Sequence, residues 1–134
     1  MNDVSLYQRV GGLTFFERLA ASFYEGIATD EVLLPLYPDP TDLAPAQRRL
    51  ALFLAQYWGG PDTYSQERGH PRLRMRHAPY LVGPLLRDHW LAHMAAAVER
   101  SGASDDVKID LMQYFVRAAE HLRNDAPIAL VDPG

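Results

Sequence analysis

The chain has 134 residues, a formal net charge of -4, and 48% hydrophobic and 22% charged residues. These values are typical of a globular domain with one sizeable core, so we expect a single domain over residues 1–134. The chain has no cysteine, which excludes disulfides, thiolate catalysis and iron–sulfur clusters.

The first residues lack the basic and apolar regions of a signal peptide. No uncharged apolar run approaches the ~20 residues that a membrane-spanning helix needs. We therefore expect a cytoplasmic protein without a membrane span. The acidic net charge argues against general binding to nucleic acid.

Apolar residues recur at helical spacing and no segment alternates with period two, so we expect an all-α protein. Ser5 and Gln8 fit a capping box that opens a short helix, which the glycine pair at 11–12 ends. Thr14 and Glu17 fit a second capping box, which predicts a helix to about residue 28.

Asp30 is placed to cap a short turn, and residues 35–40 form a proline-bounded corner with Tyr37 at its centre. Thr41 or Asp42 then starts a helix to about Trp58. We expect residues 61–70 to form a loop with at most one helical turn.

Pro79 cannot continue a helix, so a short basic helix over residues 70–77 should end near His77. Gly83 and Pro84 open a long helix to about Ser101. Ser104 caps a last helix to about residue 124. The core is expected at about 5–124, followed by a loose tail over 125–134.

Arginines and histidines crowd residues 68–77, and a basic cluster in an acidic chain can hold an anion locally. An imidazole in the last turn of a helix, beside guanidinium groups, can ligate a metal whose cofactor carries carboxylates. His77 has that position, and Leu73, one turn earlier, could pack on a porphyrin face. This pattern fits a haem pocket with His77 as a candidate iron ligand, although a lone histidine is more often a structural or exposed residue. Without cysteine, any haem would be held non-covalently, as haem b is. The other interpretation of the arginines is a solvated face.

His89 and His93 are spaced i, i+4 on the predicted long helix and so share a face. This spacing can hold zinc, but a site needs a third ligand, and no carboxylate stands at helical spacing from them. We therefore expect two surface or partly packed histidines.

Three aromatic residues with polar tips stand inside otherwise apolar stripes: Tyr24, Tyr37 and Trp90. Burying a phenol or an indole without a partner costs about 1–3 kcal/mol, so each should have a partner or a function. They are either core aromatics bonded to backbone or, if they converge on one cavity, donors for a bound diatomic ligand.

The order and spacing of several short motifs resemble the truncated haemoglobins, and within them the second group. These motifs are Tyr7 with Val10-Gly11-Gly12, Phe23-Tyr24, Leu36-Tyr37-Pro38, Gln56-Tyr57-Trp58-Gly59-Gly60-Pro61, the run from Arg68 to Pro79, and Trp90. The resemblance covers about residues 5–124. It implies a shortened globin fold in which two helices stack over two, with haem between them.

The resemblance also implies roles for individual residues. It makes His77 the proximal iron ligand and Tyr24, Tyr37 and Trp90 the distal residues. It puts Ala46 at the distal place where many globins have histidine, with Leu50 one turn further on. Cofactor contacts are expected from these residues: Arg49, Tyr64 and Arg76 at the propionates, and Leu73 and Phe53 against the macrocycle.

Three functions remain open. The first is reversible binding of O2, NO or CO. The second is an enzyme that converts NO plus O2 to nitrate with an external reductase, or a weak peroxidase; Ala46 and Leu50 supply no distal base for peroxide. The third is a cofactor-free helical module that docks an acidic partner on its arginines. A homodimer is one of the assemblies that the sequence leaves open.

Overall fold

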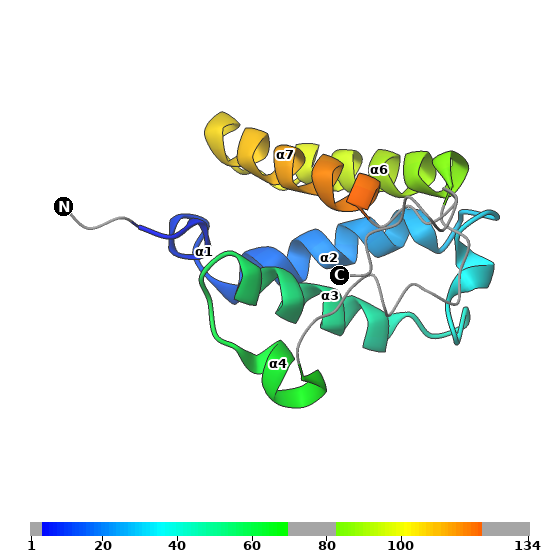
Figure 1. The fold of residues 1–134 in the computed structure, drawn as a ribbon, viewed down its shortest axis with the longest axis horizontal. Coiled ribbons are helices and arrows are strands. Elements are labelled where there is room, and N and C mark those ends of the chain that lie inside the picture. Colours follow the sequence, from blue (N-terminus) through cyan, green and yellow to red (C-terminus); the bar gives the residue numbers. More distant parts are fainter. Residues whose placement is uncertain (1–3, 70–82, 122–134) are drawn as a thin grey trace, which may run out of the picture.

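The computed structural model describes residues 4–69 and 83–121, and within these ranges every regular element is a helix. Two long helices, α2 (Leu13–Ile27) and α3 (Ala44–Tyr57), form one pair, and α6 (Pro84–Glu99) and α7 (Asp105–His121) form the other. Figure 1 shows the α6–α7 pair stacked on the pair of α2 and α3. This is the two-over-two arrangement of a truncated globin, as predicted.

Three short helices complete the described chain: α1 (Leu6–Arg9), the 3-10 helix η1 (Leu34–Leu36) and α4 (Thr63–Arg68). The capping box at α1 is confirmed, because Ser5 Oγ accepts from the Gln8 amide and the Gln8 side chain accepts from the Ser5 amide. α4 is longer than the single turn expected there. The side-chain amide of Gln56, on α3, holds it through two hydrogen bonds to Ser65, at 2.7 and 3.0 Å.

The second predicted capping box is wrong. α2 begins at Leu13, with Gly12 as its N-cap and no side-chain hydrogen bond to the cap. Gly11 and Gly12 have φ near +91° and +93°, and the Gly12 carbonyl accepts from the Phe15 amide. The glycine turn therefore starts the helix before Thr14, which lies inside the first turn.

α3 also begins later than predicted, at Ala44. The carboxylate of Asp39 accepts from the amide and hydroxyl of Thr41, and that of Asp42 accepts from the Ala44 amide. These two side chains hold the backbone in turns just before the helix. The ends of α2 and α6 and the start of α7 agree with the predictions within about two residues, and the predicted end of α7, near residue 124, lies outside the described residues.

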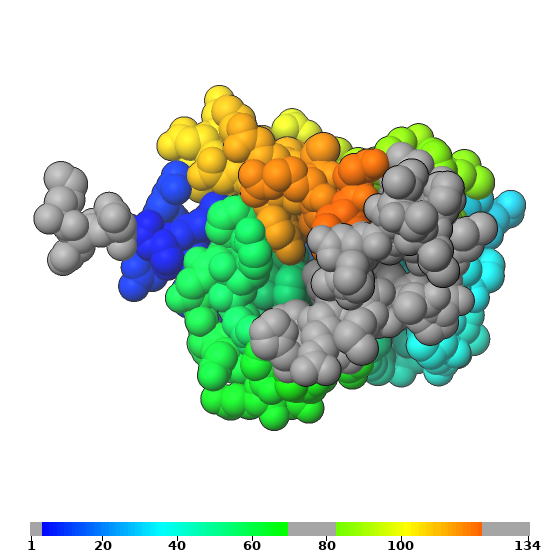
Figure 2. Space-filling view, viewed as in Figure 1, coloured from blue at the N-terminus to red at the C-terminus, as the bar shows by residue number. Residues whose placement is uncertain are grey.

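The core lies where the two helix pairs meet. Its largest fully buried side chains come from all four long helices: Phe16, Leu19, Phe23, Ile27, Leu54, Met94, Val98, Leu111 and Phe115. Figure 2 shows the same face in space-filling form, with α7 above α3 and α4. Within residues 4–69 and 83–121, no helix is long and apolar enough to cross a bilayer.

Candidate functional site

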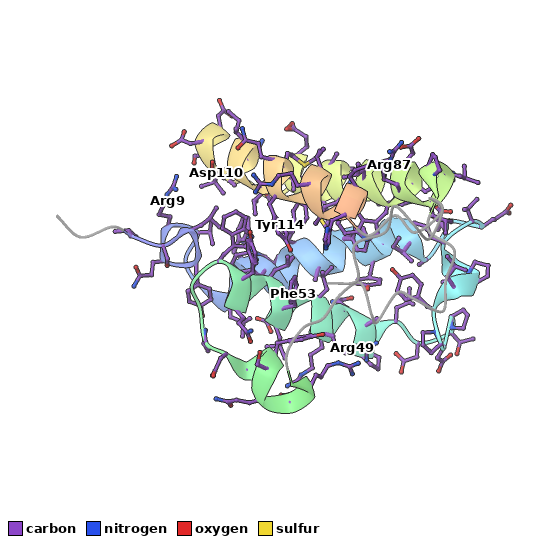
Figure 3. The ribbon with its side chains drawn as sticks, viewed as in Figure 1. Arg9, Arg49, Phe53, Arg87, Asp110 and Tyr114 are labelled. Atoms are coloured by element: carbon purple, nitrogen blue, oxygen red, sulfur yellow. The ribbon has the colours of Figure 1, made fainter. Side chains whose placement is uncertain are left out.

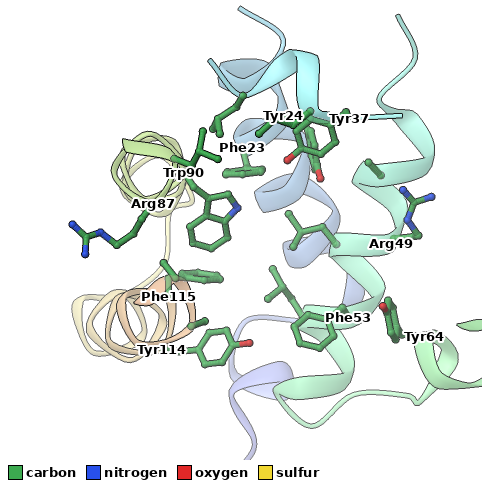
Figure 4. Close-up of a pocket in the computed structure, with 18 of the residues that line it drawn as sticks. Phe23, Tyr24, Tyr37, Arg49, Phe53, Tyr64, Arg87, Trp90, Tyr114 and Phe115 are labelled. Atoms are coloured by element: carbon green, nitrogen blue, oxygen red, sulfur yellow. The ribbon is translucent and has the colours of Figure 1, made fainter. Parts of the chain in front are cut away.

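A cavity of about 360 Å³ opens between the two helix pairs. Figure 4 shows side chains from α2, α3, α6 and α7 surrounding it, with the residue after η1 at one end and α4 at the other. Most of the wall is apolar and includes Leu33, Leu50, Phe53, Leu54, Leu86 and Phe115. A flat hydrophobic molecule suits such a lining better than a polar substrate does.

The three polar-tipped aromatics converge on this cavity. Tyr24, on α2, and Tyr37, just after η1, meet with ring centroids 5.6 Å apart, and their hydroxyls are hydrogen-bonded to each other. Trp90, on α6, presents its indole from the opposite wall (Figure 4). Its ring lies edge-on to Phe23 at 5.6 Å and to Phe115 at 5.8 Å.

The electrostatics of the cavity keep both phenols neutral. Burial raises the pKa of Tyr24 far above its usual value, and its hydrogen bond to Tyr37 raises it further. Burial also raises the pKa of Tyr37, which the bond from Tyr24 partly offsets. Both hydroxyls are therefore available as neutral hydrogen-bonding groups at physiological pH.

Three arginines line the cavity: Arg49 on α3, Arg68 on α4 and Arg87 on α6. Arg87 donates to Asp88 at 3.0 Å and to Glu120, on α7, at 2.6 Å. Arg49 has no ion pair with any carboxylate in the described ranges. A cationic side chain at an apolar cavity can bind the carboxylate of a mainly hydrophobic ligand.

The cavity brings together eight of the predicted site residues: Tyr24, Tyr37, Ala46, Arg49, Leu50, Phe53, Tyr64 and Trp90. The other three, Leu73, Arg76 and His77, lie outside the described residues. The structure thus brings together the described part of the predicted site. The roles assigned to all eleven residues remain predictions.

Sequence reasoning missed several residues of the wall, notably Arg87 and Tyr114. Figure 3 shows Tyr114 and Phe53 between α7 and α3. Tyr114 lies three residues after Leu111 on the inner face of α7, so helical spacing could have found it. Arg87 carried no such signal, because its neighbour Asp88 suggests an exposed pair.

His89 and His93 are partly packed, which confirms the expectation for this pair. His89 Nδ1 lies 2.9 Å and His93 Nε2 lies 2.6 Å from the same oxygen, Oδ2 of Asp30. Among the described residues, no group of three His, Cys, Asp or Glu side chains is arranged to hold a metal ion. Asp30 also caps its turn as predicted, since its Oδ1 accepts from the amides of Val32 and Leu33.

The described side chains fit a haem group. A porphyrin needs apolar walls for its faces and cations for its two carboxylates. Phe53, Leu50 and Phe115 provide such walls, and Arg49 supplies a cation beside them. The neutral donors Tyr24 and Trp90 are the groups that a small polar ligand inside the cavity would need.

The bacterial-like globin family matches residues 5–124, so the chain belongs to the bacterial-like globins. Membership implies a haem cofactor and the binding of diatomic gases such as O2. The chain is 34% identical to group 2 truncated hemoglobin YjbI of Bacillus subtilis over 118 residues, which cover 88% of this chain and 87% of that protein. It is 37% identical to group 2 truncated hemoglobin 3-1 of Lotus japonicus, covering 89% of this chain and 71% of the relative.

Among solved structures, the chain is similar to a thermostable hemoglobin from Thermobifida fusca. The TM-score is 0.89 at 52% sequence identity, covering 92% of this chain and 100% of the other. The resemblance to the second group of truncated haemoglobins is thereby confirmed.

Proposed function

We propose that the chain is a single globin domain that binds haem b in this cavity, with His77 as the iron ligand, and holds O2 reversibly. The observation that carries the proposal is the convergence of Tyr24, Tyr37 and Trp90 on one apolar cavity. Haem supplies an iron with an open coordination position for O2, NO or CO.

The protein's own contribution begins with holding the cofactor. Phe53 and Leu73 pack against the macrocycle in this proposal, while Arg49, Tyr64 and Arg76 bind its propionates. Phe53 and Tyr64 support one another, because their rings meet edge-on at 5.5 Å. Ala46 and Leu50 line the ligand side, where their small and apolar side chains leave room for a diatomic molecule.

The distal residues then retain the ligand. With haem bound, the indole N–H of Trp90 and the hydroxyl of Tyr24 would donate to a partly negative ligand in the cavity, and Tyr37 would orient Tyr24. A hydrogen bond to a charged acceptor contributes about 1.5–3 kcal/mol. Two such bonds slow the escape of O2 by about 10² or more, at tenfold per 1.4 kcal/mol. Such retention suits sensing, storage or conversion of O2 better than delivery.

A second candidate is the enzyme that converts NO plus O2 to nitrate with an external reductase. Strong retention favours it, because O2 then stays in the cavity until NO arrives. Peroxidase activity is disfavoured, since no Asp, Glu or His lies among the described residues that line the cavity, so none can move the peroxide proton.

The absorption spectrum of the purified full-length chain tests the proposal, with and without dithionite and CO. We expect a haem spectrum that responds to both additions. His77→Ala should abolish axial ligation and leave poorly held haem, whereas His121→Ala, at an exposed histidine on α7, should not change the spectrum. An unchanged Soret band in His77→Ala contradicts the ligand assignment, and a colourless wild type supports the cofactor-free module.

Mixing the oxygenated protein with NO in a stopped-flow instrument separates binder from enzyme. Rapid oxidation to the ferric form, followed by re-reduction with cell extract, is expected of the enzyme. Oxidation without re-reduction leaves binding as the function.

A further inference from the structure

One buried carboxylate lies between the two walls that carry the distal residues. The side chain of Asp30 is 6% exposed, and Asp30 is the only buried charged residue in the described ranges. Desolvation opposes its charge, but hydrogen bonds from His89, His93 and two backbone amides hold its pKa well below the usual range. Because Asp30 is ionised, Nδ1 of His89 and Nε2 of His93 each donate to it.

The two oxygens of Asp30 hold different elements. Oδ1 accepts from the amides of Val32 and Leu33, at 2.8 and 3.1 Å, and so fixes the start of the segment that leads through η1 to Tyr37. Oδ2 accepts from His89 and His93, which flank Trp90 on α6. A single carboxylate therefore ties the wall that bears Tyr37 to the wall that bears Trp90.

The ring of His93 has little freedom within this cluster. It lies against Gly26 of α2, where an added Cβ would come within 2.3 Å of His93 Nδ1. Glycine inside a helix costs about 1 kcal/mol relative to alanine, so its presence at this position indicates that close approach matters. Asp30 on one side and Gly26 on the other hold the imidazole in one place.

The cluster is not needed merely to join α2 to α6. Phe23 and Met94 are 1% and 0% exposed, so apolar packing already joins these helices. A second polar link lies at the other end of the same interface, where Arg100 Nη2 and Nε donate to Ser22 Oγ at 2.7 and 3.0 Å. Neither Ser22 nor Arg100 lines the ligand cavity.

We propose that Asp30, through His89 and His93, is a positioning residue that sets the separation between Trp90 and the Tyr24–Tyr37 pair, and thereby the strength with which bound ligand is held. This inference rests on the proposed distal role of Trp90. Hydrogen bonds weaken steeply with poor angle and length, so loosening α6 against the Asp30 turn weakens donation to the ligand.

The test uses the haem-loaded full chain and two readouts. One is the C–O stretching frequency of the CO complex, which reports hydrogen bonding to the ligand; the other is the O2 dissociation rate. We expect Asp30→Ala to shift or split the C–O band and to raise the O2 rate by about tenfold, because a donated bond to a charged acceptor is bent or lost. Ser22→Ala, the matched control at the other end of the interface, should leave both readouts unchanged.

Conservative variants distinguish positioning from packing. The amide of His93→Gln or His89→Asn can still donate to Asp30, so both variants should remain close to wild type. His93→Leu and His89→Leu fill the space without donating and should resemble Asp30→Ala. The leucine variants also provide the answer if Asp30→Ala does not fold.

Trp90→Phe separates the failure of this inference from the failure of the proposed function. If Trp90→Phe alters both readouts while the leucine variants do not, the positioning role is refuted and the distal role stands. If Ser22→Ala has the same effect as Asp30→Ala, the cluster is a general packing contact and the inference is refuted as well. If Trp90→Phe changes neither readout, both ideas are wrong.

Discussion

Replacing Trp90 by phenylalanine removes one N–H donor while keeping an aromatic ring in the same wall. The indole packs edge-on against Phe23 and Phe115, with ring centroids 5.6 and 5.8 Å away, and a phenyl ring can make both contacts. In the proposed distal role of Trp90, the main loss is the hydrogen bond to the ligand, worth about 1.5–3 kcal/mol. At tenfold per 1.4 kcal/mol, the O2 dissociation rate should rise by about 10- to 100-fold.

The rate is measured by stopped-flow mixing of the oxygenated protein with dithionite and CO. Trp58→Phe provides a matched control, because Trp58 also lies against aromatic rings, including Tyr114 at 5.7 Å. Its Nε1–H is buried and has no hydrogen-bond partner among the described residues, and Trp58 does not line the cavity. We expect Trp58→Phe to leave the rate unchanged. If Trp90→Phe also leaves it unchanged, the indole serves packing only and the distal assignment is wrong.

Two further predictions concern stability. Burial raises the pKa of Tyr114 to about 12. Its contribution to the free energy of unfolding is therefore complete below pH 10, where the phenol is neutral in the folded and unfolded states, and is lost as the pH rises through 12. Ionisation of Tyr114 should therefore lower the free energy of unfolding of the wild type by about 2 kcal/mol between pH 10 and 12. Urea unfolding of Tyr114→Phe should lack this fall, and a pH slope equal to that of the wild type contradicts the prediction. Phe16→Ala should cost about 3–5 kcal/mol, because Phe16 is 0% exposed and contacts Phe15 and Tyr7. Val116→Ala, at a residue 50% exposed, should stay within about 0.5 kcal/mol, and equal costs in the two variants would contradict this view of the core.

Local signals predicted most of the helices, and competition between local signals explains the errors. The apolar spacing of Phe16, Leu19 and Phe23 predicted α2 because one buried stripe dominates that helix. Thr14 satisfied the capping rule, but the glycine turn before it had already started the helix. The rule describes which side chain can cap and does not decide between neighbouring starts.

The candidate site depends on contacts that local patterns do not contain. The sequence singled out Tyr24, Tyr37 and Trp90 as polar tips in apolar stripes, and the resemblance to truncated haemoglobins gave them a common place. Asp30 was predicted only as a turn cap, although its other oxygen accepts from His89 and His93, which lie 59 and 63 residues further along the chain. No periodicity reports a partner at that distance, because the pairing arises only when α6 packs on α2.

The contact between Gly26 and His93 should couple substitutions at two distant positions. Any side chain at position 26 collides with the imidazole, so the glycine can be replaced only after residue 93 has become smaller or has turned away. In the same way, the imidazole of His93 can keep its packed position beside residue 26 only while that residue has no side chain. Homologues that carry a larger residue at the first position should therefore lack histidine at the second, and their two helices should be linked by some other means.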